Sequence, residues 1–309
     1  MLRILIVGAG GIGGYYAARL LHAGHEVVLT ARGAHLAALQ EQGLTVQYGD
    51  EVWSFPVQAL DHPGVVGRYR PDDFDVVVVT LKSTATEAML RELGPWLYHG
   101  KVPVLSLQNG VDNEPEMASL LGEHRVLGGL AVRIGGHILQ PGVVEAEGPA
   151  QIVMGEWPVA AESDSRRPLL EQLRGDFEAA GIPTTVSDNI RCELWRKLVI
   201  NNGVNPLSAL TGLDTRSLTH HPEFWKIVHG MMAETVAASK ADGANLGPGD
   251  LAEMFDLISN FNAIKTSMLV DREKGRPLEL DSIAGAALSC AAAHNWASTH
   301  HTPRRLTPC

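Results

Sequence analysis

The hydrophobic and polar positions in the first half of the chain alternate between strand-like and helix-like patterns. Residues 4–7, 75–81 and 102–107 are short, almost uninterrupted apolar runs, as is typical of strands buried on both faces of a sheet. A segment of helical period follows the first run, and another follows the second and is expected to continue to about Leu93. Repeated strand–helix units of this kind predict an α/β fold with a doubly wound, mostly parallel sheet.

The pattern changes twice in the rest of the chain. Residues 137–157 read as short strands broken by Pro141-Gly142 and Gly148-Pro149, and they predict an antiparallel extension. After Ser187 the pattern is helical almost to the end, beginning with a helix that Ser187 or Asp188 can cap. We therefore predict an α/β domain over residues 1–187 and an all-helical domain over residues 188–309. The other expected elements are strands at 44–47, 52–57, 125–127 and 184–186, and helices at 169–180, 222–241 and 249–265.

The first apolar run ends in glycines with the spacing G-x-G-x-x-G. Gly8, Gly10 and Gly13 lie where a buried strand turns into a helix. Gly8 permits the tight turn, Gly10 lets the backbone approach a pyrophosphate, and Gly13 lets the helix pack close to the strand. The start of the helix offers free N–H groups and a partial positive charge to phosphates. This context predicts a Rossmann-type, dinucleotide-binding domain over residues 1–187.

The second strand, expected at 26–30, narrows the choice of cofactor. NAD-preferring sites usually carry an acidic residue at the tip of this strand, where it binds the 2′-hydroxyl of the ribose. This chain has Ala31-Arg32-Gly33 there, so no acidic residue at the tip repels a 2′-phosphate, and Arg32 can pair with one. The alternative is that Arg32 is a solvated surface residue. We favour NADP (NADPH) over NAD.

Composition and charge exclude several classes of protein. The length of 309 residues suggests two domains or one large one, and the composition, with 45% hydrophobic and 19% charged residues, is typical of a globular protein. Its net charge of −10 argues against a nucleic-acid partner, and no apolar run reaches the length of a membrane span. The N-terminal segment is apolar but lacks a charged leader and a cleavage site, so its glycines explain it better as a strand. The adjacent histidine pairs, His220-His221 and His300-His301, do not have metal-ligand spacing. The three cysteines, Cys192, Cys290 and Cys309, form no metal or disulfide pattern, which fits a reducing cytoplasm.

Polar residues follow two of the predicted buried strands. Lys82 follows the run at 75–81, and Asn109 follows the run at 102–107. Ligands of open α/β sheets lie beyond the carboxyl ends of the strands, so both residues are expected at the cofactor-facing edge. The helical domain would then close this crevice and supply the substrate contacts. Two plainer interpretations stay open: Lys82 as a solvated strand end, and Asn109 as a turn residue before Gly110.

A third polar feature lies in the helical half. Lys197, Asn201 and Asn205 are spaced i, i+4 and i+8, so they form one stripe if the helix reaches Asn205. Gly203 and Pro206 make that last turn uncertain. An amine and two amides in an otherwise apolar segment are costly to bury without partners. The alternative is a solvated helix face, although such faces usually carry Glu and Lys.

Taken together, these segments resemble the ketopantoate reductase (2-dehydropantoate 2-reductase) family over about residues 1–285. The resemblance implies a Rossmann-type domain followed by a helical domain similar to that of 6-phosphogluconate dehydrogenase. It also implies reduction of a 2-oxo acid, ketopantoate, with NADPH on the way to pantothenate. The residues that carry the resemblance are Gly8-Ala9-Gly10-Gly11-Ile12-Gly13, Leu81-Lys82, Gln108-Asn109-Gly110-Val111, Leu194-Trp195-Arg196-Lys197-Leu198, Asn201, Asn205-Pro206, Thr266-Ser267-Met268-Leu269 and Glu279-Leu280-Asp281.

The resemblance further implies roles for individual residues. Lys197 would be the catalytic lysine, which donates a proton as hydride adds to the 2-keto carbon, and Asn109 would bridge the cofactor and the substrate. Glu279 can accept a hydrogen bond from the 4-hydroxyl group of ketopantoate. Its alternative is a structural pairing with a nearby basic residue: Arg272, Lys274 or Arg276. The residues expected to hold the substrate are Asn201, Asn205, Ser267 and Glu279, and those expected to hold the cofactor are Gly8, Ala9, Gly10, Gly11, Ile12, Gly13, Arg32, Lys82 and Asn109.

Several alternatives remain open. The tail at about 294–309 has little apolar period and departs from the family pattern, as expected of a disordered segment or an altered reading frame. The substrate alternative is a different 2-oxo acid, reduced by the same chemistry. A non-catalytic NADP-binding regulator would need the glycine turn but not Lys197, Asn109, Ser267 and Glu279 together. A homodimer is also left open, because the sequence does not indicate an oligomeric state.

Overall fold

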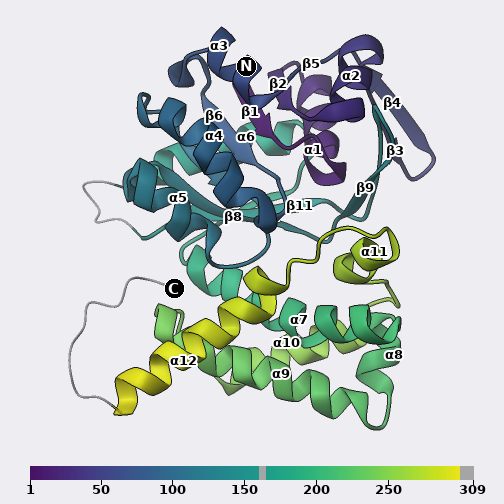
Figure 1. Ribbon diagram of the computed structural model, residues 1–309, viewed down its shortest axis with the longest axis vertical. Helices are drawn as coiled ribbons and strands as arrows, with labels where there is room; N and C mark the ends of the chain where they lie inside the picture. Colours follow the sequence, from purple (N-terminus) through teal and green to yellow (C-terminus); the bar gives the residue numbers. More distant parts are fainter. Residues whose placement is uncertain (160–164, 300–309) are drawn as a thin grey trace. The chain divides into compact units, whose positions relative to one another are not determined.

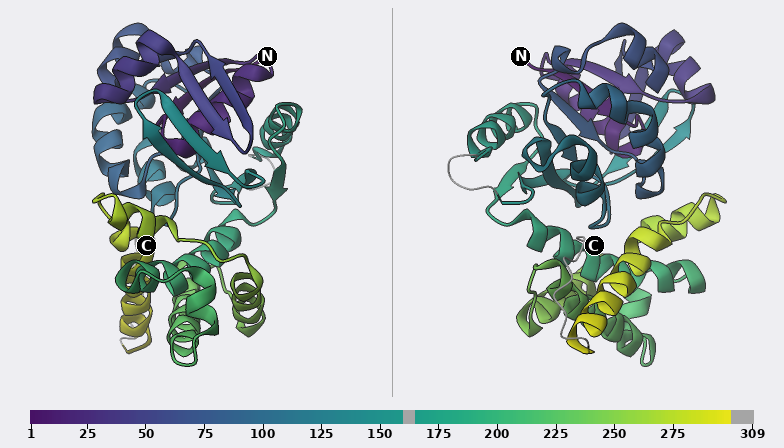
Figure 2. Two further views of the ribbon diagram at one scale, coloured as in Figure 1. Left: turned by 90° about the vertical axis from the view of Figure 1, so that its right-hand side faces the viewer. Right: turned by 60° about the vertical axis from the view of Figure 1, so that its left-hand side comes forward.

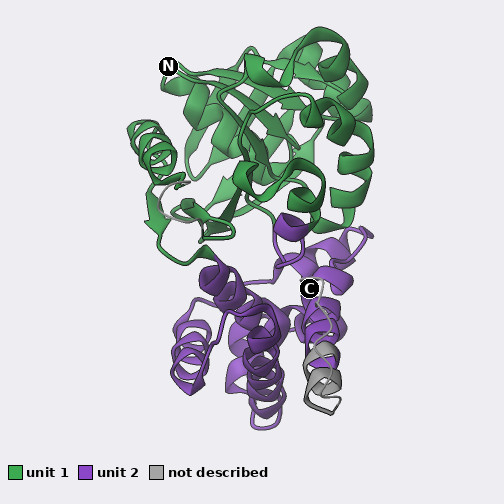
Figure 3. Cartoon of the chain, turned by 90° about the vertical axis from the view of Figure 1, so that its left-hand side faces the viewer, with its two compact units in different colours: residues 1–108, 116–190 green, residues 109–115, 191–309 purple. Residues whose placement is uncertain are grey.

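The structure of the chain is a computed structural model that describes residues 1–159 and 165–299. The chain divides into two compact units, drawn in green and purple in Figure 3. The first unit comprises residues 1–108 and 116–190, and the second comprises residues 109–115 and those from 191 onward. The segment 109–115 thus belongs with the helical residues, although it follows a strand of the first unit.

An eight-stranded sheet forms the centre of the first unit, in the order β12-β11-β8-β7-β6-β1-β2-β5 (Figure 1). Neighbouring strands are parallel, except for the antiparallel pair β8 and β11. The four valines of β6 are at most 3% exposed, and burying each of them contributes roughly 1.5–3 kcal/mol. The expected α/β fold class is confirmed. The strands are β1 (Arg3–Val7), β2 (Glu26–Thr30), β5 (Gln58–Leu60), β6 (Val76–Val79), β7 (Val104–Ser106), β8 (Val126–Val132), β11 (Gln151–Glu156) and β12 (Thr184–Ser187).

A second sheet of four strands has the order β4-β3-β10-β9. Its strands are β3 (Leu44–Tyr48), β4 (Glu51–Phe55), β9 (Gly135–Gln140) and β10 (Val143–Glu147). Strands β3 and β4, expected at 44–47 and 52–57, form a hairpin around Gly49-Asp50, and β10 pairs in parallel with β3 and antiparallel with β9 (Figure 2). The extension expected at 137–157 is therefore divided: β9 and β10 join this sheet, whereas β11 belongs to the main sheet.

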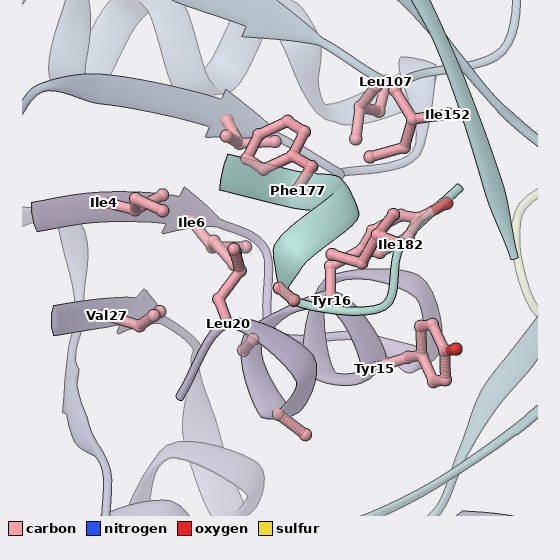
Figure 4. Packing of buried hydrophobic residues seen from close by; sticks show 14 of the residues in the cluster. Ile4, Ile6, Tyr15, Tyr16, Leu20, Val27, Leu107, Ile152, Phe177 and Ile182 are labelled. Carbon is pink, nitrogen blue, oxygen red and sulfur yellow. The ribbon is translucent and has the colours of Figure 1, made fainter. Parts of the chain in front are cut away.

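Helix α1 (Gly11–His22) packs against strands of both sheets. Its side chains Tyr15, Tyr16 and Leu20 are at most 2% exposed and belong to one cluster with Ile4 and Ile6 of β1 (Figure 4). This packing fixes the position of the turn that precedes α1. The other helices of the first half are α2 (Gly33–Gln42), α3 (His62–Arg68), α4 (Thr86–Tyr98), α5 (Asn113–Leu121) and α6 (Arg167–Ala179).

The second unit is helical. Helix α9 contacts α8, α10 and α12 (Figure 1), and α7 packs on α9 through Gly203, where a Cβ would lie 2.5 Å from Cγ of Met232. Trp195 of α7 is fully buried, and its indole nitrogen donates to Oδ2 of Asp242 at 2.7 Å. The helices are α7 (Ile190–Thr211), α8 (Thr215–His220), α9 (Phe224–Ala238), α10 (Pro248–Asn260), α11 (Ser267–Glu273) and α12 (Ala286–Thr299).

Three helices expected to end at about residues 93, 241 and 265 end elsewhere, and the second of them, α9, ends at Ala238. Helix α4 continues past Leu93 to Tyr98, with Pro95 inside it, and α10 ends at Asn260 instead of near residue 265. Helix α7 does not stop at Pro206 and runs on to Thr211, so Asn205 is helical. The tail expected to be atypical, at about 294–309, includes the end of α12, and its residues 300–309 lie outside the described residues.

Candidate active site

The glycines of the turn between β1 and α1 differ in what surrounds them. Gly8 has φ +110°, and a Cβ there would lie 2.8 Å from Cδ2 of Leu81. A Cβ at Gly13 would lie 2.1 Å from the carbonyl oxygen of Gly8. A Cβ at Gly10 would meet no atom within 4 Å. Gly8 and Gly13 are therefore required by the backbone and its packing, whereas Gly10 leaves open surface at the start of the helix.

The first turn of α1 can accept an anion. Its N-cap is Gly10, with no side-chain cap and no acidic residue in the first turn, so backbone N–H groups and the helix dipole favour negative charge there. Together with the open surface at Gly10, this arrangement fits the pyrophosphate of a dinucleotide. Gly11 has another role, because a Cβ there would lie 2.0 Å from the carbonyl carbon of Gly136 in β9. Of the neighbouring residues, Ala9 is buried and Ile12 is half-buried.

Arg32 lies after β2, exposed, at the N-cap of α2. Its Nη2 is 3.5 Å from Oε2 of Glu92, a residue of α4. The same carboxylate oxygen lies 2.5 Å from Nδ1 of His62, the first residue of α3. The tip of β2 itself carries no acidic residue, but the folded unit brings one close to Arg32. The acid comes from a different helix.

Lys82 and Gln108 follow neighbouring parallel strands, β6 and β7. Lys82 is exposed and precedes a short 3-10 turn at Ser83–Ala85. Gln108 is buried, and its Nε2 donates to Oγ1 of Thr86 at 2.9 Å. Because the carboxyl ends of parallel strands meet at one edge, both residues leave the sheet on the side where the β1–α1 turn lies.

Helix α7 carries Lys197, Asn201 and Asn205 on one face, as their spacing predicts. Lys197 and Asn201 are half-buried, and Asn205 is 4% exposed. The face is therefore not a solvated one, which argues against the plainer interpretation of the stripe. A partly buried ammonium group beside amides has the chemistry needed to donate a proton to an oxygen that gains negative charge.

Asn109 and Glu279 lie together in the second unit. Nδ2 of Asn109 is 3.5 Å from Oε2 of Glu279, whose side chain is 3% exposed. Gly110 has φ +102°, which lets the chain turn after Asn109. At the other partner of this contact, Glu279 is followed by a π-helical turn at Asp281–Gly285 that leads into α12. Two loops far apart in the sequence thus supply one polar contact.

A second buried carboxyl group lies beside this contact. Asp112 receives a hydrogen bond from the side chain of Ser282, while its Oδ1 is buried and makes no hydrogen bond with any of the described residues. Burial raises the pKa of Asp112 above its ordinary value, and the negative charges of Glu279 and Asp281 raise this pKa further. Neither Asp112 nor Ser282 was predicted from the sequence, although Asp112 lies only three residues after Asn109.

The remaining candidates lie on other elements. Ser267 is exposed at the first residue of α11, directly after the N-cap Thr266. Two basic residues considered as structural partners of Glu279 make contacts elsewhere: Arg272 donates to the carbonyl oxygen of Ala209, and Arg276 lies 3.7 Å from Asp271.

Among residues 1–159 and 165–299, no group of three or more His, Cys, Asp or Glu side chains is arranged to hold a metal ion. None of the helices in those ranges is long and apolar enough to cross a membrane.

A doubly wound α/β unit with a glycine-rich turn, followed by a helical unit with a lysine–asparagine stripe, has the architecture of a dinucleotide-dependent oxidoreductase. The chain belongs to the ketopantoate reductase family. The family model described as ketopantoate reductase PanE/ApbA matches residues 4–159, and the model of its C-terminal part matches residues 189–302. The second match runs past residue 285, where the resemblance was expected to end.

Individual relatives agree with this assignment. The chain is 32% identical to the 2-dehydropantoate 2-reductase of Mesorhizobium japonicum, over 92% of this chain and 90% of the relative. It is similar to the crystal structure of 2-dehydropantoate 2-reductase from Geobacter metallireducens, with a TM-score of 0.81 and 30% identity over 94% of this chain and 93% of that one. A D-mandelate dehydrogenase with NADH and anilino(oxo)acetate has a TM-score of 0.83 at 20% identity over 95% and 93% of the two chains, a likeness of fold alone.

Proposed function

We propose that this chain is an NADPH-dependent 2-dehydropantoate 2-reductase, which reduces ketopantoate to pantoate in the synthesis of pantothenate and coenzyme A. The observation that carries the proposal is the 32% identity to a relative of that name, which extends over 92% of this chain. The buried Glu279 beside Asn109 supports it, because a carboxylate next to an anionic 2-oxo acid is unfavourable unless it accepts a specific hydrogen bond.

The chain's own residues bind and orient the cofactor, and the nicotinamide supplies the hydride when it is bound. The open first turn of α1, from Gly8 to Gly13, takes the pyrophosphate. Arg32 pairs with the 2′-phosphate, since its guanidinium group is exposed beside the end of β2 and can form a fork with a phosphate. Lys82 and Asn109 contact the cofactor nearer its reactive end. NADPH is the preferred form because of Arg32.

Lys197 acts as the general acid. As hydride adds to C2 of the 2-oxo acid, the C=O π bond opens and its electron pair moves to the oxygen. The ammonium group of Lys197 stabilises that negative charge and transfers one proton to it, which gives the 2-hydroxy acid and a neutral lysine. The partial burial of Lys197 strengthens this electrostatic interaction, because fewer water molecules screen it.

Uncharged groups and one carboxylate orient the substrate. Asn201, Asn205 and Ser267 bind the substrate carboxylate with amide and hydroxyl donors, which add no competing negative charge. Glu279 accepts a hydrogen bond from the 4-hydroxyl group, and Asn109 contacts both substrate and cofactor. The 4-hydroxyl contact is what distinguishes ketopantoate from other 2-oxo acids of similar size.

The test of this proposal is NADPH oxidation by the purified protein with ketopantoate and with a panel of 2-oxo acids. The panel includes a branched 2-oxo acid of similar size that lacks the hydroxyl group, and each assay is repeated with NADH. We expect the highest kcat/KM for ketopantoate with NADPH. Higher kcat/KM for another 2-oxo acid would assign the same reaction to a different substrate. If the protein binds NADPH tightly but oxidises it with none of the 2-oxo acids, it is a non-catalytic NADP-binding protein and the proposed function is wrong.

A further inference from the structure

The guanidinium group of Arg32 already has an anionic neighbour. Its Nη2 lies 3.5 Å from Oε2 of Glu92, and the two side chains are 60% and 45% exposed. An exposed ion pair of this kind contributes little to the stability of the fold. The pair matters more for ligand binding, because Arg32 is the residue that any phosphate near the end of β2 would meet.

Glu92 is held in place by a third residue. Oε2 of Glu92 lies 2.5 Å from Nδ1 of His62, whose ring is only 4% exposed. His62 opens α3, where the side chain of Asp61 caps the helix by accepting from the backbone N–H of Gly64 at 2.8 Å. A buried ring at the start of a capped helix has little freedom to move. The carboxylate of Glu92 is therefore directed towards Arg32 by its surroundings.

A phosphate and this carboxylate compete for the same guanidinium group. A 2′-phosphate that forms two hydrogen bonds with Arg32 brings nearly two negative charges close to Glu92. Coulomb repulsion between charges about 6 Å apart in a water-exposed site amounts to roughly a five- to tenfold change in affinity. A ribose 2′-hydroxyl carries no charge, so binding of NADH does not meet this repulsion.

We propose that Glu92, positioned by His62, sets how strongly the protein discriminates between a 2′-phosphate and a 2′-hydroxyl, by competing with the phosphate for Arg32. The inference rests on the proposed use of Arg32 for NADPH. In this inference, the acidic residue near the adenosine end of the cofactor comes from α4. In NAD-preferring sites that residue usually stands at the tip of β2. Glu92 lowers the affinity for NADPH and leaves that for NADH nearly unchanged.

The test is direct binding of cofactors and fragments to the full chain. Dissociation constants are measured by calorimetry for NADPH, NADH, adenosine 2′,5′-bisphosphate and AMP. The variants are Glu92→Gln, Arg32→Ala and the double variant. The control is Glu87→Gln, which removes the same charge from α4 at an exposed residue that pairs with Arg91. Thermal unfolding of each variant confirms that the fold is retained.

For Glu92→Gln we expect NADPH and adenosine 2′,5′-bisphosphate to bind about five- to tenfold more tightly, whereas NADH and AMP change little. Arg32→Ala should weaken the two 2′-phosphorylated ligands by about tenfold or more, and the gain from Glu92→Gln should largely disappear in the double variant. Glu87→Gln should leave the ratio of NADPH to NADH affinity as it is.

The outcomes separate this inference from the proposed function. If Arg32→Ala lowers the preference for NADPH but Glu92→Gln leaves it unchanged, the role of Glu92 is wrong and that of Arg32 stands. If Arg32→Ala weakens all four ligands equally, Arg32 does not bind the 2′-phosphate, and both ideas are wrong. If Glu92→Gln weakens NADH and AMP, Glu92 binds the ribose hydroxyl groups directly, which also overturns the inference.

Discussion

The side-chain nitrogen of Asn109 lies 3.5 Å from Oε2 of Glu279, a residue 170 positions further along the chain. The segment 109–115 belongs to the same compact unit as Glu279, so this contact is internal to one body. Asp112 and Ser282 link the same two segments a second time. The loop after β7 and the turn before α12 are therefore joined at two points, and a change at Glu279 is expected to affect Asn109 as well.

We expect Glu279→Ala to separate substrate recognition from chemistry. Losing a hydrogen bond to a charged group costs about 1.5–3 kcal/mol, so kcat/KM for ketopantoate should fall by about tenfold to a hundredfold. The fall should be smaller for a 2-oxo acid of similar size without the hydroxyl group, and NADPH affinity should barely change. Steady-state kinetics with both substrates and a binding measurement for NADPH check this.

Glu279→Gln is the matched variant for this prediction. It keeps the size of the side chain and one carbonyl oxygen, removes the charge, and replaces the other carboxylate oxygen with an NH2 donor. A smaller loss than in Glu279→Ala is expected with ketopantoate. If both substrates lost the same factor in both variants, the hydroxyl contact would be wrong, and Glu279 would serve mainly to position Asn109.

Lys197→Ala should lower turnover strongly and leave NADPH binding nearly intact. The reason is the loss of the proton donor, which typically costs about 10²–10⁴-fold in rate. The control is Lys226→Ala on α9, an exposed lysine that pairs with Glu223 and should have normal kinetics. Single-turnover oxidation of NADPH measures the chemical step, and a Lys197→Ala variant with near-normal turnover would remove Lys197 from the catalytic role.

Asp250 gives a prediction about stability and pH. Its Oδ2 accepts from the backbone N–H of Gly247 at 2.9 Å, and its Oδ1 accepts from Nη1 of Arg196 at 2.5 Å. The hydrogen bond from Gly247, followed by that from Arg196, holds the pKa of this carboxyl below its ordinary value of 3.8. A lowered pKa means that the folded state is stabilised above the ordinary pKa and loses this stabilisation as the pH falls through the lowered value.

Asp250→Asn should therefore lower the free energy of unfolding by about 0.5–1 kcal/mol at neutral pH, and the difference from the parent protein should shrink below about pH 4. Urea unfolding at several pH values measures it. Asp256→Asn removes the same charge from an exposed position of α10 and should have little effect. A difference that persisted unchanged in acid would mean that the carboxylate is not the source of the stabilisation.

Local patterns predicted the parts of the fold whose causes are local. The apolar run that ends in Gly8, and the run of valines at 76–79, gave their strands because burial on both faces requires uninterrupted apolar residues. The stripe of Lys197 and Asn205 was expected from helical spacing, and α7 indeed runs through both. The pairing of β10 with β3 was not predicted, because strand pairing depends on residues far apart in the chain.

The candidate site shows the same difference between features with local causes and contacts between distant segments. Arg32 could be found from its place after β2, but Glu92 could not be linked to it, since their proximity depends on how α2 and α4 lie in the folded unit. The choice of Glu279 came from the family resemblance alone, and nothing in its local sequence indicates burial beside Asn109. Charged contacts between distant segments are the part that periodicity cannot predict.

Two glycine variants should separate cofactor binding from folding. A Cβ at Gly10 meets open space, so Gly10→Ala should leave the unfolding of the cofactor-free protein almost unchanged while it obstructs the pyrophosphate. NADPH affinity is expected to fall by about tenfold or more, equivalent to roughly 1.4 kcal/mol.

In contrast, a Cβ at Gly13 would lie 2.1 Å from the carbonyl oxygen of Gly8, so Gly13→Ala should destabilise the fold by about 1–3 kcal/mol through overpacking. Gly67→Ala is the control, since a Cβ there also meets no atom within 4 Å. It should leave NADPH affinity unchanged and stabilise the fold by up to about 1 kcal/mol, because Gly67 lies inside α3. Denaturant unfolding without cofactor and NADPH titration check all three, and normal NADPH affinity in Gly10→Ala would show that the pyrophosphate does not bind at the first turn of α1.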